Sequence, residues 1–78
     1  MSLREVSSMN SFQISLKAAR VNANMTQEDV AKALKRNKQT IVNWENGITG
    51  IHITDFKKLA DLYKIPIEKL KIPERRER

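Results

Sequence analysis

The apolar residues at positions 11–71 recur at helical spacing throughout, and this pattern constrains the fold more than any other feature. No segment alternates apolar and polar residues as a half-buried strand would, and only two glycines and two prolines interrupt the chain. The sequence therefore predicts an all-α fold around one core, and 78 residues are enough for one small domain. We expect this domain to span residues 11–71, between a flexible N-terminal arm at 1–10 and a flexible C-terminal tail at 72–78.

Signals for helix starts and ends divide the domain into five predicted helices. Thr26 and Asn37 are good N-cap residues, Asn46-Gly47 suits a helix end, and Pro66 suits a first helical turn. The predicted helices are Ser11–Val21, Gln27–Leu34, Lys38–Glu45, His52–Tyr63 and Pro66–Lys71. Two further apolar residues are expected to enter the core near helix starts: Phe12 and Ile53.

The predicted helix 38–45 has two faces of different chemistry. Ile41 and Trp44 share one face, which suits burial in a core. The opposite face carries Lys38, Gln39, Val42 and Asn43. Amides can pair with adenine, a lysine can donate to guanine and a valine methyl can contact a thymine methyl, so this face suits a DNA major groove. It would equally suit an ordinary solvated surface, and the helix alone leaves both interpretations open.

The chain is strongly basic, with fifteen Lys/Arg against nine Asp/Glu and a formal net charge of +6. This charge favours an anionic partner, either nucleic acid or an anionic membrane surface. The cations gather around the turn before helix 38–45. Residues 31–43 contain Lys32, Lys35, Arg36 and Lys38 and no acidic residue. DNA phosphates flanking a groove would lie at this turn, and their neutralisation would make binding steeply salt-dependent.

Other classes of function lack the residues they need. The chain has no cysteine, which excludes disulfides and thiolate chemistry and fits a reducing compartment. No apolar run approaches the roughly 18 residues of a membrane span, and the N-terminus lacks the apolar stretch of a signal peptide. The single histidine, His52, has no second histidine or cysteine nearby, and there is no glycine-rich phosphate loop. We therefore expect a cytoplasmic protein that is not an enzyme and has no metal, cofactor, membrane or small-molecule partner.

Two runs of residues resemble a known family. The first is Met25-Thr26-Gln27-Glu28-Asp29-Val30-Ala31 with Leu34, followed by Thr40-Ile41-x-x-Trp44-Glu45-Asn46-Gly47. The second is Phe56-x-x-Leu59-Ala60-x-x-Tyr63-x-Ile65-Pro66-Ile67-x-x-Leu70. Together they resemble the lambda-repressor-like helix-turn-helix family, which includes the Cro and XRE groups. The resemblance covers about residues 11–71. It implies a compact five-helix domain of prokaryotic or phage origin, associated with the nucleoid when bound to DNA.

The resemblance also implies a role for each part of the motif. It implies a sequence-specific regulator of transcription, acting as a repressor, that binds a palindromic operator in double-stranded DNA as a homodimer. The implied base-reading residues are Lys38, Gln39, Thr40, Val42 and Asn43. The implied phosphate-binding residues are Gln27 and Asn46. From their place at the basic turn we also expect Lys35, Arg36 and Asn37 to contact phosphate. An ion pair between Arg20 and Glu45 is implied as well, and it would fix the base-reading helix to the scaffold.

The sequence departs from the family pattern at three places. Lys35 and Lys64 stand where the family often has glycine at a helix end, and a non-glycine residue with positive φ costs on the order of 1 kcal/mol. The loop after Gly47 is also more apolar than is usual. Its Ile48 and Ile51 could form a dimer contact or could fold back onto the core, and the sequence leaves both open.

The sequence is also compatible with a second class of function, which is binding to another protein. The same scaffold can serve as a protein-interaction module, such as the antitoxin of a toxin pair or a phage-type antagonist. The basic turn, free of acidic residues, favours DNA over this alternative. RNA binding ranks third, because aromatic residues for base stacking make up only 5% of the chain.

Overall fold

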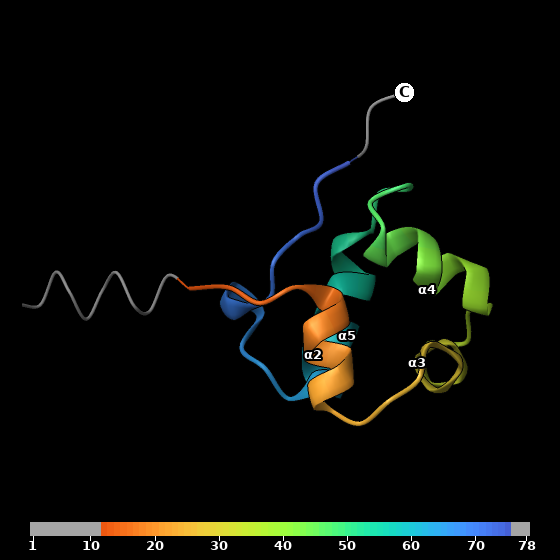
Figure 1. The fold of residues 1–78 in the computed structure, drawn as a ribbon, viewed down its shortest axis with the longest axis horizontal. Coiled ribbons are helices and arrows are strands. Elements are labelled where there is room, and N and C mark those ends of the chain that lie inside the picture. Colours follow the sequence, from red (N-terminus) through yellow and green to blue (C-terminus); the bar gives the residue numbers. More distant parts are fainter. Residues whose placement is uncertain (1–11, 76–78) are drawn as a thin grey trace, which may run out of the picture.

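The computed structural model describes residues 12–75, which form an all-α domain (Figure 1). Four α-helices follow one another along this part of the chain: α2 (Leu16–Asn22), α3 (Gln27–Leu34), α4 (Lys38–Glu45) and α5 (Ile53–Tyr63). One turn of 3-10 helix, η1 (Ile67–Lys69), follows α5. The predicted N-terminal arm at residues 1–10 lies outside the described residues, as do residues 76–78 of the predicted tail.

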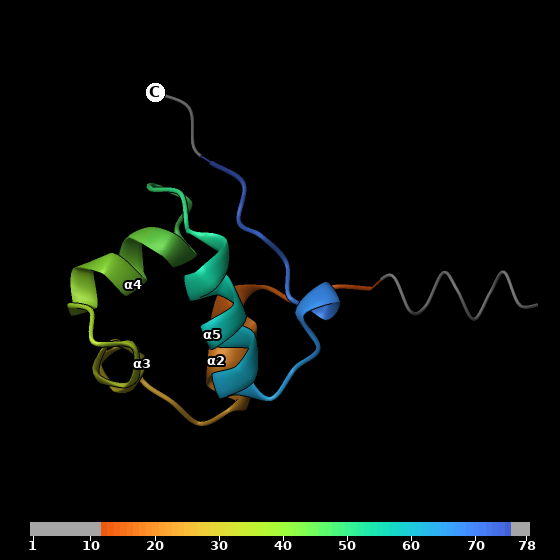
Figure 2. The same ribbon diagram turned by 180° about the vertical axis from the view of Figure 1, so that it is seen from behind.

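The helices pack as two pairs. α2 lies against α5, and α3 lies against α4 on one side of that first pair (Figures 1 and 2). The turn between α3 and α4 is only three residues long, which holds the two helices in a fixed relation. No helix among residues 12–75 is long and apolar enough to cross a membrane.

Capping side chains set where α3 and α4 begin. Thr26 Oγ1 accepts a hydrogen bond from the Asp29 N–H (3.0 Å), and the Asp29 carboxylate accepts one from the Thr26 N–H (2.9 Å). The bond from the Thr26 N–H is the largest cause of a lowered pKa at Asp29. Asn37 Oδ1 accepts from the Thr40 N–H (2.9 Å) at the start of α4. The N-caps predicted at Thr26 and Asn37 are therefore confirmed.

Three non-glycine residues after helices adopt the left-handed conformation. Asn24, Lys35 and Lys64 have φ values of 60°, 58° and 58°. Asparagine tolerates this region, whereas a lysine is strained in it. Both lysines nonetheless adopt this conformation, and at each of them the backbone N–H donates to carbonyl groups in the last turn of the preceding helix. These hydrogen bonds stabilise the end of the helix.

The prediction of a first helix from Ser11 was wrong, because α2 begins only at Leu16. Ser15 is the N-cap, and its side chain accepts a hydrogen bond from the Ala18 N–H (3.0 Å). Phe12 shares helical spacing with Leu16 but precedes the cap, and its side chain is 70% exposed rather than buried. Phe12 therefore fits the helical spacing of the apolar residues although it lies before the start of the helix.

The predicted fifth helix was also wrong, so the described domain has four α-helices instead of five. After η1 the backbone becomes extended at Leu70, which forms a parallel bridge with Ile14. The Ile14 N–H donates to the Lys69 carbonyl (2.9 Å) and the Lys71 N–H donates to the Ile14 carbonyl (2.8 Å). These two bonds replace the helical ones, and they place Leu70 in the core with 1% exposure.

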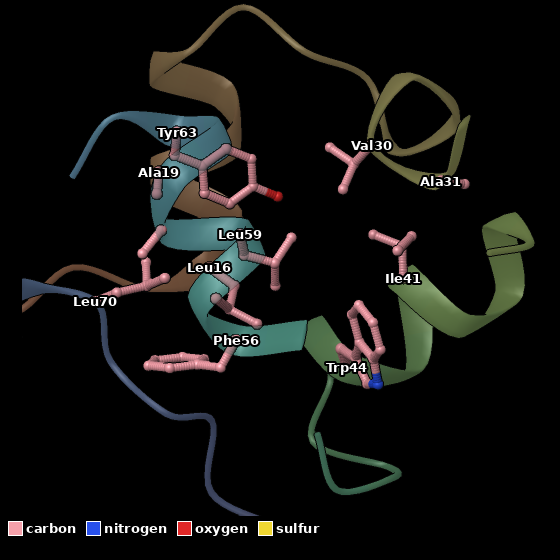
Figure 3. Close-up of a cluster of buried hydrophobic side chains, with 11 residues drawn as sticks. Leu16, Ala19, Val30, Ala31, Ile41, Trp44, Phe56, Leu59, Tyr63 and Leu70 are labelled. Carbon is pink, nitrogen blue, oxygen red and sulfur yellow. The ribbon is translucent and has the colours of Figure 1, made fainter. Parts of the chain in front are cut away.

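The four α-helices and Leu70 contribute to one core (Figure 3). Its buried members are Leu16, Ala19, Val30, Ala31, Ile41, Trp44, Phe56, Leu59, Ala60, Tyr63 and Leu70. The expectation that Ile53 enters this core was wrong, since its side chain is 63% exposed. The buried stripe of α5 begins at Asp55 and Phe56, and the first turn of α5 extends beyond the edge of the core.

Candidate nucleic-acid interface

One face of α4 is packed into the core and the other faces outward. Ile41 and Trp44 are 1% and 5% exposed, and they point from α4 toward α5 and the core (Figure 3). The outward side chains are those singled out in the sequence: Lys38 and Gln39 are exposed, whereas Thr40, Val42 and Asn43 are half-buried. The helix therefore presents a narrow, mainly polar stripe of side chains to the outside, and its opposite face is fixed by packing in the core.

Two amides within this stripe bond to each other. Gln39 Nε2 donates to Asn43 Oδ1 (3.0 Å), one helical turn away. This bond uses one donor of Gln39 and one acceptor site of Asn43. It leaves the Gln39 oxygen and the Asn43 amino group available to a ligand. The pair is thus oriented before any ligand arrives.

A buried ion pair connects the end of α4 to α2. Arg20 Nε donates to Glu45 Oε2 (2.7 Å), Nη2 donates to Glu45 Oε1 (3.3 Å), and Nη1 donates to the Met25 carbonyl (2.9 Å). The Arg20 and Glu45 side chains are only 11% and 4% exposed. Gln27 Nε2, at the start of α3, donates to Glu45 Oε1 (3.1 Å). This network therefore joins three helices at the point where α4 ends, and it occupies one of the two amide hydrogens of Gln27.

The turn between α3 and α4 is tied to α5 by a second ion pair. Arg36 Nη2 donates to both carboxylate oxygens of Asp55 (3.1 and 2.9 Å). The Asp55 side chain is 5% exposed, whereas that of Arg36 is 46% exposed. Asp55 was not predicted from the sequence, where its only signal was its position directly before the inward-facing Phe56. The arrangement gives Arg36 a structural partner within the protein.

Asn37, predicted to contact phosphate, accepts bonds from both the backbone N–H and the hydroxyl of Thr40 (2.9 and 2.8 Å). Its amino group remains for other contacts. Lys35 is exposed at the tip of the turn, and Asn46 is exposed directly after α4. Among residues 12–75 no group of three or more histidine, cysteine or acidic side chains could hold a metal ion.

This arrangement is two short helices joined by a tight turn, with the second helix backed by a core and tied at its end. A family model described as helix-turn-helix (HTH_3) matches residues 16–70. The chain belongs to this lambda-repressor-like helix-turn-helix family. Comparison with curated proteins and comparison with solved structures each gave no match.

Membership in the helix-turn-helix family makes this a DNA-binding regulatory domain. In its motif α3 is the first helix and α4 the second. The loop after α4 contains two apolar residues, Ile48 and Ile51, which differ in their exposure. Ile48 is 50% exposed, whereas Ile51 is half-buried and packs against the core. Of these two isoleucines, Ile48 is therefore the more exposed.

Proposed function

We propose that this protein is a sequence-specific regulator that inserts α4 into the major groove of double-stranded DNA and acts as a repressor. The outward stripe of α4 carries this proposal. It combines an exposed lysine with the bonded amides of Gln39 and Asn43, on a helix held rigidly by the core and by Glu45. Rigid placement matters because a binding constellation must be held within about 0.5 Å of its productive geometry.

The stripe has the chemistry for direct readout. A free amide oxygen and amino group match the N6 donor and N7 acceptor of adenine, and Lys38 can donate to guanine O6 or N7. Each well-placed pair contributes about 1–3 kcal/mol of discrimination against a wrong base. Thr40 and Val42, which are half-buried, have room for lesser contacts such as that of a methyl with thymine.

Phosphate contacts would gather at the turn. Lys35 is exposed and has no ion-pair partner among the described residues. Gln27 keeps one amide hydrogen for phosphate, and Arg36 keeps donors beyond the single nitrogen that binds Asp55. The amino group of Asn37 and the polar groups of Asn46 would contact the backbone at the two ends of α4. These contacts position the protein without reading sequence.

Repression by this chain would use two copies on a palindromic operator. Two-fold symmetry would place the recognition helices in successive major grooves, roughly 34 Å apart. The exposed Ile48, beside the end of α4, is our candidate for the contact between copies. Sedimentation of wild type and Ile48→Asp at micromolar concentration, free and with operator, tests this. An unchanged distribution of species in both conditions would remove Ile48 from the interface.

Selection of bound sequences from random duplex DNA tests the function itself. We expect a short palindromic motif for the wild type, and loss of preference at a few base positions for Gln39→Ala and for Asn43→Ala. Asn22→Ala is the matched control, since Asn22 is an exposed amide at the end of α2. Placing the selected motif across a promoter driving a reporter then tests repression.

Wild-type binding with no base preference at any salt concentration would leave only charge-driven association. The scaffold would then be better explained as a protein-interaction module.

A further inference from the structure

The two ends of α4 differ in the charge that the helix-turn-helix motif gives them. Eight helical residues span about 12 Å, which is close to the width of the major groove, so both ends of α4 would approach phosphates. The N-terminal end has Lys35, Arg36 and Lys38 beside it. Residues 39–51, which include the C-terminal end and its loop, contain no lysine or arginine. The motif therefore supplies cations at only one edge of the groove.

A segment from outside the motif lies at the uncharged end. We call residues 71–75 the C-terminal strap; it follows the bridge at Leu70 and runs up beside the loop after α4 (Figures 1 and 2). The Glu74 carbonyl lies so close to Gly47 that a Cβ there would overlap it. Gly47 also has φ +70°, so two features of this site require glycine. The strap therefore packs against the domain at Gly47.

The strap brings positive charge to this place. The guanidinium of Arg75 lies over the loop, with Nη1 3.3 Å from where a Cβ on Gly50 would be. The residues that line an open pocket here include Lys71 and Arg75 of the strap and Asn46 and Gly47 of the loop after α4. Within residues 12–75 neither Lys71 nor Arg75 forms an ion pair, and both are exposed.

The charges around this pocket favour an anion. Glu45 also lines it, but its carboxylate is paired with Arg20. Glu74 contributes one negative charge, which leaves the strap with a net positive one. The C-terminal end of a helix carries partial negative charge, and α4 has no basic residue in its last turn. An anion at this end would therefore need the cations of the strap.

The pocket also lies in line with the outward stripe of α4. Gln39, Asn43 and Asn46 follow one another at helical spacing along the same face of α4. A duplex whose bases meet Gln39 and Asn43 would present its next phosphates beyond Asn46. That is the position at which the strap crosses Gly47.

We propose that Lys71 and Arg75 form a second phosphate-contact site, which binds the DNA backbone at the groove edge opposite the α3–α4 turn. The inference rests on the proposed function, because it assumes that α4 enters a groove. It assigns the strap to the DNA-binding surface and extends that surface beyond the helix-turn-helix motif.

A purely structural role for these cations makes a different prediction. If they only offset the partial charge at the end of α4, their loss would lower thermal stability and leave the salt dependence of binding unchanged. If they contact phosphates, their loss would flatten the salt dependence, with a slope of about −0.9 in log K against log salt for each contact.

The test uses the full chain and its selected duplex. The double variant K71A/R75A should reduce the magnitude of the salt slope by about 1.8, the value for two contacts. The ratio of wild-type to variant affinity should then be about 12-fold larger at 50 mM salt than at 200 mM, from the same slope. Lys64→Gln is the control, because it removes one charge at the far end of α5, about 16 Å of helix away from the loop.

The outcomes separate this inference from the function on which it rests. A flattened slope for K71A/R75A and an unchanged one for Lys64→Gln support the phosphate site. Equal slopes for wild type and K71A/R75A overturn it while leaving the DNA-binding function intact. A wild-type chain with no base preference overturns both.

Discussion

Removing Glu45 should destabilise the domain far more than removing any exposed acid. The Arg20 and Glu45 side chains are 11% and 4% exposed, so water screens their interaction little. In Glu45→Ala the Arg20 guanidinium would keep only the Met25 carbonyl, and the Gln27 amide would lose its acceptor. Leaving one member of a buried pair alone costs about 3–5 kcal/mol. Total stability for 78 residues is only about 4–12 kcal/mol, so much of it would be lost.

Urea unfolding followed by tryptophan fluorescence measures this loss, since Trp44 is the only tryptophan and is 5% exposed. The double variant R20M/E45L should be more stable than Glu45→Ala, because it leaves no unpaired buried charge. Asp61→Ala is the matched control, an exposed acid on α5 whose loss should change stability by less than about 0.5 kcal/mol. Similar small losses for Glu45→Ala and Asp61→Ala would refute the reasoning.

Three other predictions follow from the backbone and from one buried phenol. Lys35→Gly should be more stable than Lys35→Ala by about 1 kcal/mol, since both lose the charge and only glycine relieves the positive φ; equal urea midpoints would contradict this. Gly47→Ala should lower the thermal midpoint, because a Cβ would overlap the Glu74 carbonyl and φ is +70°; deleting residues 72–78 as well should recover part of that loss, and no recovery would mean that the overlap is unimportant. Burial, followed by the charge of Glu45, raises the pKa of Tyr63 to about 12 from 10.0. Its stabilising contribution is therefore complete below pH 10 and is lost as the pH rises toward 12, by at most about 3 kcal/mol. Tyr63→Phe should lack this alkaline loss, and parallel pH profiles for the two proteins would exclude Tyr63 as its cause.

The parts of the fold that local chemistry determines could be predicted from the sequence. The caps at Thr26 and Asn37 are formed by residues three positions apart, so the sequence alone places the starts of α3 and α4. The inward faces of these helices follow from apolar spacing, as Ile41 and Trp44 illustrate. The helix-turn-helix motif was therefore the most predictable part of the chain.

Features that depend on distant segments were missed or misplaced. Leu70 was expected within a last helix, Pro66–Lys71, but it pairs with Ile14 and its backbone is extended. Phe12 continued a helical pattern whose start was set by Ser15. In the candidate interface, the partner of Arg36 could not be predicted, because Asp55 reaches it only once α5 is packed. Spacing along one helix says nothing about which residue of another helix will lie opposite.

The bridge between Ile14 and Leu70 also has a consequence for how the chain is made. It pairs residues from the two ends of the described domain, whereas the capping box of α3 and the helix turns involve near neighbours. Contacts of such long sequence separation form late in folding. Bringing the two segments together costs the entropy of closing a long loop, and this cost is smaller once the chain between them is ordered. During synthesis α2 to α5 leave the ribosome before Leu70 does, and until then Ile14 lacks its pairing partner. We therefore expect the nascent domain to become resistant to protease only when residues 70 and 71 have emerged.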